Sequence, residues 1–156
     1  CRLCALVILV NRFKKQPDET VEFYLSHTKG INNWDLVDLS APYILGSYMV
    51  DRSDRKVLYE LAASKNMWEQ RIAVVSTLML IRHGQFADTM KLAERFLNTK
   101  HDLMQKATGW MLREVGKRHV AILTEFLEKY KSSMPRTMLR YAIEKFSPEQ
   151  RRYFMD

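Results

Sequence analysis

Two tryptophans, one carboxylate and two cationic side chains stand at positions where they could do chemistry together: Trp34, Asp38, Arg71, Lys106 and Trp110. A carboxylate beside a sugar can stabilise an oxocarbenium-like centre or orient a water molecule toward it. Tryptophan faces attract cations, and arginine and lysine pair with phosphates. In one groove, these groups suit hydrolysis of an N-glycosidic bond to a positively charged base. Such a base leaves as a neutral molecule, so no strong general acid is needed.

The elements that must position these side chains are helices. Apolar residues recur at intervals of three and four through almost the whole chain, and no alternating strand pattern is present. Helix starts are expected at Ser53 and at Ser147-Pro148, and Gly30 and Gly84 follow expected helix ends. We predict helices over residues 1–15, 18–27, 33–49, 53–64, 67–82, 86–98, 101–117, 119–131, 135–146 and 148–154.

The helices repeat along the chain. The segments LSHTKGINNW, LAASKNMWEQ and FLNTKHDLMQ share a helix end, a Ser/Thr-Lys pair and a fresh helix. Their hydroxyl residues Thr28, Ser64 and Thr99 are 36 and 35 residues apart. A period near 35 with two helices per unit is typical of an α-solenoid, and the absence of TPR markers favours HEAT-like repeats. We therefore predict one all-α domain over residues 1–156, an α-solenoid of HEAT-like antiparallel helix pairs with a concave basic groove.

The shared register predicts that the five side chains face one groove. Counted from the hydroxyl residue of each repeat, Arg71 and Lys106 lie at +7, Asp38 at +10 and Trp110 at +11. Offsets of three and four keep side chains on one helix face, and Trp34 precedes Asp38 by four. The second helix of each unit usually lines the concave side of a solenoid, so we expect all five to project there.

Charge and cysteine content narrow the partners and the setting. The chain carries a formal charge of +7, and residues 100–156 hold twelve Lys/Arg against seven Asp/Glu. This surplus favours a polyanion such as nucleic acid, although a basic protein without such a partner is the alternative. Cys1 and Cys4 make no disulfide framework, which favours a reducing, cytoplasmic setting. The opening CRLCALVILV is too short to span a bilayer.

Other chemistries find no support in the sequence. The four histidines and two cysteines lack metal-ligand spacing, and no phosphate-binding or dinucleotide-binding glycine loop or GxSxG nucleophile motif is present. We therefore expect no metal and no organic cofactor.

Plainer interpretations stand beside each candidate residue. The tryptophans, Trp68 above all, could be core residues, and Asp35 or Asp38 could simply favour the helix dipole. Arg71 could form an ordinary ion pair between repeats, and residues 113–119 could be a solvated helix end. Two non-enzymatic functions compete with glycosidic hydrolysis: a DNA-binding HEAT-like module, and a scaffold for an acidic protein.

Three pieces of sequence carry a family resemblance: NNWDLVDLSA, SKNMWEQRIAVV and DLMQKATGWMLREVGK. Their order and spacing over about residues 1–146 resemble the AlkD-like DNA alkylation repair enzymes, a group of HEAT-like repeat DNA glycosylases. The resemblance implies that Asp38 is the catalytic carboxylate and Arg71 the second essential polar residue. It also implies that Trp34 and Trp110 line the site beside the lesion.

The resemblance further implies the reaction and its setting. The expected substrate is duplex DNA carrying cationic N3- or N7-alkylated purines, excised without extrusion of the base into a deep pocket. We assign Lys106 and Arg113 to DNA binding and expect a monomer. Family members begin with about two further helical pairs, roughly 70 residues at this repeat length. The chain is therefore expected to be an N-terminally truncated fragment that is either inactive or unstable with its first helix exposed, or that keeps activity through its main site residues, and whose function is that of the intact parent.

Overall fold

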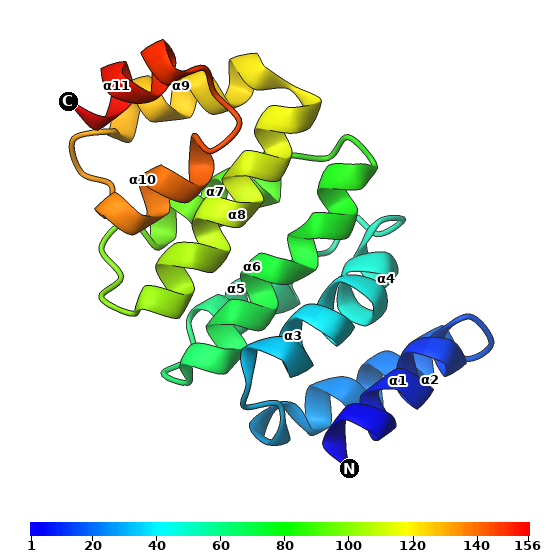
Figure 1. Cartoon of the computed structure of the whole chain (residues 1–156). Helices are drawn as coiled ribbons and strands as arrows, with labels where there is room; N and C mark the ends of the chain where they lie inside the picture. The colour runs from blue at the N-terminus through cyan, green and yellow to red at the C-terminus, as the bar shows by residue number, and fades with distance from the viewer. The chain divides into compact units, whose positions relative to one another are not determined.

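The computed structural model describes residues 1–156 and is helical throughout, with no strand (Figure 1). This confirms the predicted all-α class. Contacts along the chain separate two compact units, Cys1–His83 and Gly84–Asp156, and each is described by itself. The solenoid arrangement, the concave basic groove and the single domain remain predictions. None of the helices has the length and apolar character needed to cross a lipid bilayer.

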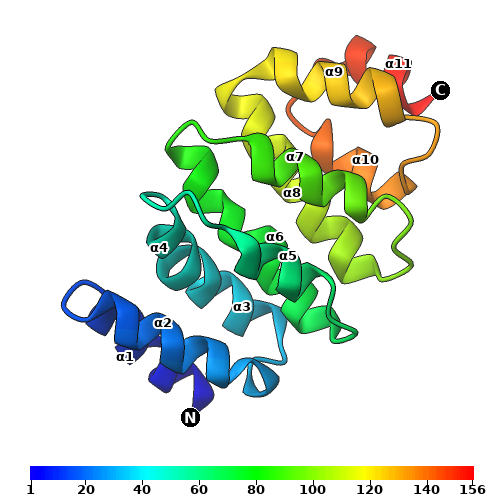
Figure 2. The ribbon, with the colours of Figure 1, turned by 180° about the vertical axis from the view of Figure 1, so that it is seen from behind.

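The first unit is built around one long buried helix. Helix α6 packs on α5, on α3 and on the turn that follows α3, while α1 packs on α2 and α3. Figure 2 shows α2 and α5 on the side turned away in Figure 1. The elements are α1 (Arg2–Phe13), α2 (Pro17–Ser26), the 3-10 turn η1 (Thr28–Gly30), α3 (Trp34–Ala41), the π-helical turn η2 (Pro42–Gly46), α4 (Ser47–Met49), α5 (Lys56–Ala62) and α6 (Met67–Arg82).

The predicted helix 33–49 is one helical segment with a π turn in its middle, which the sequence analysis did not predict. Pro42 has no amide hydrogen, so it cannot donate the usual helical bond to the backbone carbonyl of Asp38. The turn widens instead, and the amide of Ser47 donates to the carbonyl of Pro42. Gly46 lets this wide turn lie against α6, because a Cβ there would clash with the carbonyl oxygen of Ser76.

The second unit packs five helices around an apolar cluster that includes Leu112, Leu127, Met138 and Leu139, all fully buried. Helices α8 and α10 approach most closely at Gly109, where a Cβ would lie 2.5 Å from the carbonyl oxygen of Met138. The helices are α7 (Ala87–Arg95), α8 (Asp102–Arg118), α9 (Val120–Tyr130), α10 (Arg136–Ala142) and α11 (Pro148–Met155).

Helix ends test the predicted signals one by one. Ser147 caps α11 in a capping box with Gln150, and Pro148 takes the first helical position, as predicted. The prediction that Ser53 caps a helix is wrong: α5 begins at Lys56, whose amide donates to Asp54 Oδ1 at 3.1 Å. Gly84 follows α6 with a φ of 73°. Gly30 ends the η1 turn rather than following α2 directly.

Candidate functional site

A carboxylate and a guanidinium meet between α3 and α6. Arg71 Nε donates to Asp38 Oδ1 at 3.1 Å, and Arg71 Nη2 donates to Asp38 Oδ2 at 2.9 Å. The Arg71 side chain is 6% exposed and that of Asp38 is 21% exposed. The structure therefore brings together two of the predicted site residues, and part of the carboxylate remains open to solvent.

Helix α3 carries Asp38 and Trp34 on its open side. Its buried residues are Leu36, Val37, Ser40 and Ala41, which pack into the first unit. Trp34 is 54% exposed and lies one helical turn before Asp38. The interpretation of Trp34 as a core residue is therefore wrong. Asp38 is not a helix cap either, because α3 begins four residues before it.

The first turn of α6 is fastened by Glu69, two residues before Arg71. Thr28 Oγ1 donates to Glu69 Oε2 at 2.8 Å, and Ser64 Oγ donates to Glu69 Oε1 at 2.8 Å. One carboxylate thus ties η1 and the end of α5 to the start of α6. Since α6 holds Arg71, this network fixes the helix end from which the guanidinium reaches Asp38.

The repeat predicted from the hydroxyl residues has a counterpart in hydrogen bonds. In the first unit, Gln70 Nε2 donates to the carbonyl of Ser64 at 2.7 Å. In the second unit, Gln105 Nε2 donates to the carbonyl of Thr99 at 3.0 Å. Each glutamine lies six residues after its hydroxyl residue. The two connections therefore use the same local bond to lead into α6 and α8.

A buried hydroxyl pair lies beneath the open face of α3. Tyr24 is fully buried, and its hydroxyl donates to Ser40 Oγ at 2.8 Å while Ser40 Oγ donates to the carbonyl of Leu36 at 2.5 Å. Burial raises the pKa of the Tyr24 hydroxyl well above its ordinary value; the Ser40 hydrogen bond opposes this shift, and the nearby negative charge of Asp38 adds to it. Tyr24 therefore stays a neutral donor.

The remaining predicted residues lie on α8 in the second unit, at spacings of four and three that keep them on one side of the helix. Lys106 Nζ pairs with Asp102 Oδ2 at 2.8 Å, Trp110 is half-buried, and Arg113 pairs with Glu144. Their approach to Asp38 and Trp34 remains a prediction.

Sequence reasoning missed the supporting groups Glu69, Tyr24 and Ser40. The available signal was the pair of hydroxyl residues Thr28 and Ser64, which served only as repeat markers. Their equivalent positions in successive repeats did not show that both hydroxyls would donate to the carboxylate of Glu69. That depends on how close the three residues lie in the folded protein.

No group of three or more metal-ligating side chains lies close enough to hold an ion. Both cysteines are free and exposed. A cavity of about 810 Å³ in the first unit lies beside Asp18, Tyr48 and Arg52, and neither Asp38 nor Arg71 lines it. Part of the Asp38 carboxylate thus reaches solvent, while the Arg71 side chain that holds it is buried.

The family model described as DNA alkylation repair enzyme matches residues 1–146. This chain therefore belongs to the DNA alkylation repair enzyme family. No curated protein and no solved structure gives a significant match. The family membership supports a role in DNA alkylation repair, and it confirms the resemblance drawn from the three sequence pieces.

Proposed function

We propose that this protein is a DNA glycosylase that hydrolyses the N-glycosidic bond of cationic N3- or N7-alkylated purines in duplex DNA. The observation that carries this proposal is the two-point pairing of Asp38 with Arg71, one helical turn from an exposed indole. The partly exposed Asp38 carboxylate suits a lesion that stays largely within the duplex.

The proposed reaction needs only one carboxylate. Each oxygen of Asp38 accepts one bond from Arg71 and keeps a further acceptor site for water. As the bond between C1′ and the purine nitrogen breaks, its electrons neutralise the cationic base, and Asp38 stabilises the positive sugar. Water adds to C1′ and its proton passes through Asp38 to solvent. The products are a free alkylpurine and an abasic site.

The surrounding groups have separate roles in the proposal. The Trp34 face lies against the cationic lesion, where a ring quadrupole attracts positive charge. Trp110 lines the same site, while Lys106 and Arg113 contact backbone phosphates and make binding salt-dependent. The protein acts as a cytoplasmic monomer without a metal or organic cofactor.

Base release from methylated duplex DNA tests the proposal. The full-length protein should free methylated purines, separated by chromatography, and Asp38→Asn should still bind the duplex but release no base. If the wild-type protein binds methylated duplex without freeing base, it is a non-catalytic DNA-binding module. If it has no salt-dependent affinity for DNA, it is a protein-binding scaffold.

A further inference from the structure

Arg113 is an arginine whose donors are only partly used. Its side chain is 19% exposed and pairs with the carboxylate of Glu144, which is 53% exposed. Its Nε is buried and has no hydrogen-bond partner. Buried donors are nearly always paired, so the hydrogen-bonding capacity of this guanidinium is not fully met within the protein.

Two small cavities of the second unit meet at this arginine. The larger, about 490 Å³, is lined by Arg113, Arg140, Tyr141 and Glu144. The smaller, about 230 Å³, is lined in part by Arg113, Lys117 and Lys145. The two cavities together are lined by four cationic side chains and one carboxylate, Glu144, which lines the larger cavity. Lys117 also pairs with Glu114 on its own helix at 3.1 Å. The cavities favour an anion.

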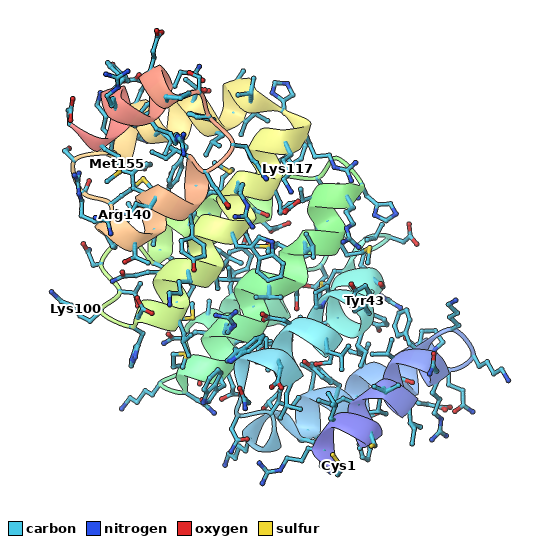
Figure 3. All side chains as sticks on the ribbon, viewed as in Figure 1. Cys1, Tyr43, Lys100, Lys117, Arg140 and Met155 are labelled. Carbon is cyan, nitrogen blue, oxygen red and sulfur yellow. The ribbon has the colours of Figure 1, made fainter.

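The packing of α8 against α10 creates this place. The two helices lie side by side in both ribbon views (Figures 1 and 2), and Gly109 permits their close approach. Arg113 follows Gly109 by one turn of α8, and Glu144 lies just beyond the end of α10. Figure 3 labels Lys117 and Arg140, which come from these neighbouring helices. Three of the cations therefore come from two closely packed helices, and Lys145 from the segment that follows α10.

We propose that this α8–α10 site binds a phosphodiester of the DNA backbone, and that Glu144 is an internal anion which the phosphate displaces from Arg113. The planar fork of arginine fits a carboxylate and a phosphate in the same way. The Glu144 side chain is half exposed, so its carboxylate can leave Arg113 and become hydrated without a large change in the protein. The phosphate oxygens then accept from Arg113 Nη1, the nitrogen that Glu144 releases, and face Arg140. This inference rests on the DNA-binding part of the proposed function and not on its chemistry.

Glu144 should therefore weaken DNA binding by competition. Glu144→Gln removes the competing charge, and we expect it to tighten binding of an undamaged duplex by about 3- to 10-fold at low salt. Arg140→Gln changes an exposed side chain and should weaken binding, with a salt slope smaller by about 1. When Glu144→Gln is added to Arg113→Gln, it should not tighten DNA binding further, because the arginine that Glu144 neutralises is absent.

The test measures affinity of the full-length protein for an undamaged duplex by fluorescence anisotropy over a salt series. Glu125→Gln, an exposed charge change on α9, is the matched control, and a thermal melt of each variant checks folding. A tightening specific to Glu144→Gln supports the proposal. Equal effects of Glu144→Gln and Glu125→Gln, or unchanged binding in Arg140→Gln, overturn it. Undamaged DNA makes the result independent of base release.

Inorganic phosphate distinguishes the source of the anion. Phosphate and chloride are compared at equal ionic strength, without DNA, by the shift in melting temperature of the wild-type protein and of Arg113→Gln. Equal shifts in both salts exclude a site for free phosphate, so that a gain in duplex affinity specific to Glu144→Gln is assigned to the phosphodiester. A stabilisation by phosphate that Arg113→Gln abolishes overturns that assignment and indicates a site for free phosphate.

Discussion

The guanidinium of Arg71 donates hydrogen bonds to both carboxylate oxygens of Asp38, at 3.1 Å from Nε and 2.9 Å from Nη2. This two-point contact joins α6 to α3 within the first unit. Because arginine presents two parallel donors, it fixes the plane of the carboxylate as well as its position. Lysine in its place would supply a point charge without that orientation.

Arg71→Ala should weaken DNA binding and slow base excision. It leaves a mostly buried carboxylate without its partner, so we expect the free energy of unfolding to fall by about 3 kcal/mol. Arg71→Lys should be less destabilising than Arg71→Ala, because lysine restores the positive charge. It should still slow excision clearly, because lysine lacks the two parallel donors that orient the carboxylate. Denaturant titration and single-turnover excision measure the two effects. Unchanged excision kinetics in Arg71→Ala would remove this residue from the site.

Glu69→Gln should loosen the start of α6. The amide keeps one acceptor oxygen and replaces the second by an NH2 donor, so one of the hydroxyls of Thr28 and Ser64 loses its acceptor and both lose a charged partner. We expect a loss of about 1–3 kcal/mol in unfolding free energy. Glu60→Gln is the control, since Glu60 is exposed and 4.0 Å from Lys56, and it should cost under about 1 kcal/mol. Equal losses in the two variants would exclude the bracing role of Glu69.

Gly109→Ala should destabilise the second unit. The added Cβ would lie 2.5 Å from the carbonyl oxygen of Met138 and 2.6 Å from Tyr141 Cβ, so α8 and α10 must separate. We expect a cost of about 1–3 kcal/mol in thermal or urea unfolding. Gly30→Ala is the matched control, because its Cβ would meet nothing within 4 Å and its φ is not positive. Equal melting temperatures of Gly109→Ala and Gly30→Ala would contradict the prediction.

Tyr24 should make the protein sensitive to alkaline pH. Its pKa is raised in the folded state, chiefly by burial, while the unfolded chain ionises near its ordinary value of about 10. Below that pH both states hold the proton and no effect arises. Above it the unfolded state loses the proton first, so stability falls as pH rises toward the folded pKa.

Tyr24→Phe checks this pH dependence. The variant cannot ionise, so its unfolding free energy should fall less steeply above about pH 10 than that of the wild type. At neutral pH it should lose about 1 kcal/mol, because the bond to Ser40 is gone. Parallel denaturation curves across the pH series for both proteins would show that another group causes the alkaline loss.

Much of the helical order was predictable because apolar spacing of three and four residues is a direct consequence of helix geometry. Helix α6 begins and ends where predicted, at Met67 and Arg82. The predicted helices 86–98 and 135–146 run past their observed ends at Arg95 and Ala142. Their last residues form turns in which hydrogen bonds to the third residue before, as from Leu97 to Glu94 and from Glu144 to Tyr141, replace most of the α-helical ones, while apolar residues continue, so the pattern alone could not place the ends.

The candidate site was also predictable only in part. The register predicted that Asp38 and Arg71 belong to successive repeats, but the two-point geometry depends on side-chain conformation that spacing does not set. Pro42 was visible in the sequence, yet its π turn also needs the close contact of Gly46 with α6. The stabilising role of Glu69 could not be predicted, because its two hydrogen-bond donors, Thr28 and Ser64, lie 41 and 5 residues away in the sequence.

The central claim is that the Asp38 carboxylate, held by Arg71, carries out glycosidic hydrolysis. The most direct test is the single-turnover rate of 7-methylguanine release by the full-length protein, in Asp38→Asn and in Asp35→Asn. Asp35 is an exposed carboxylate on the same helix and serves as the matched control. We predict that Asp38→Asn binds the duplex but slows release by at least about 100-fold, while Asp35→Asn stays near wild type. Equal release rates in Asp38→Asn and the wild type would contradict the claim.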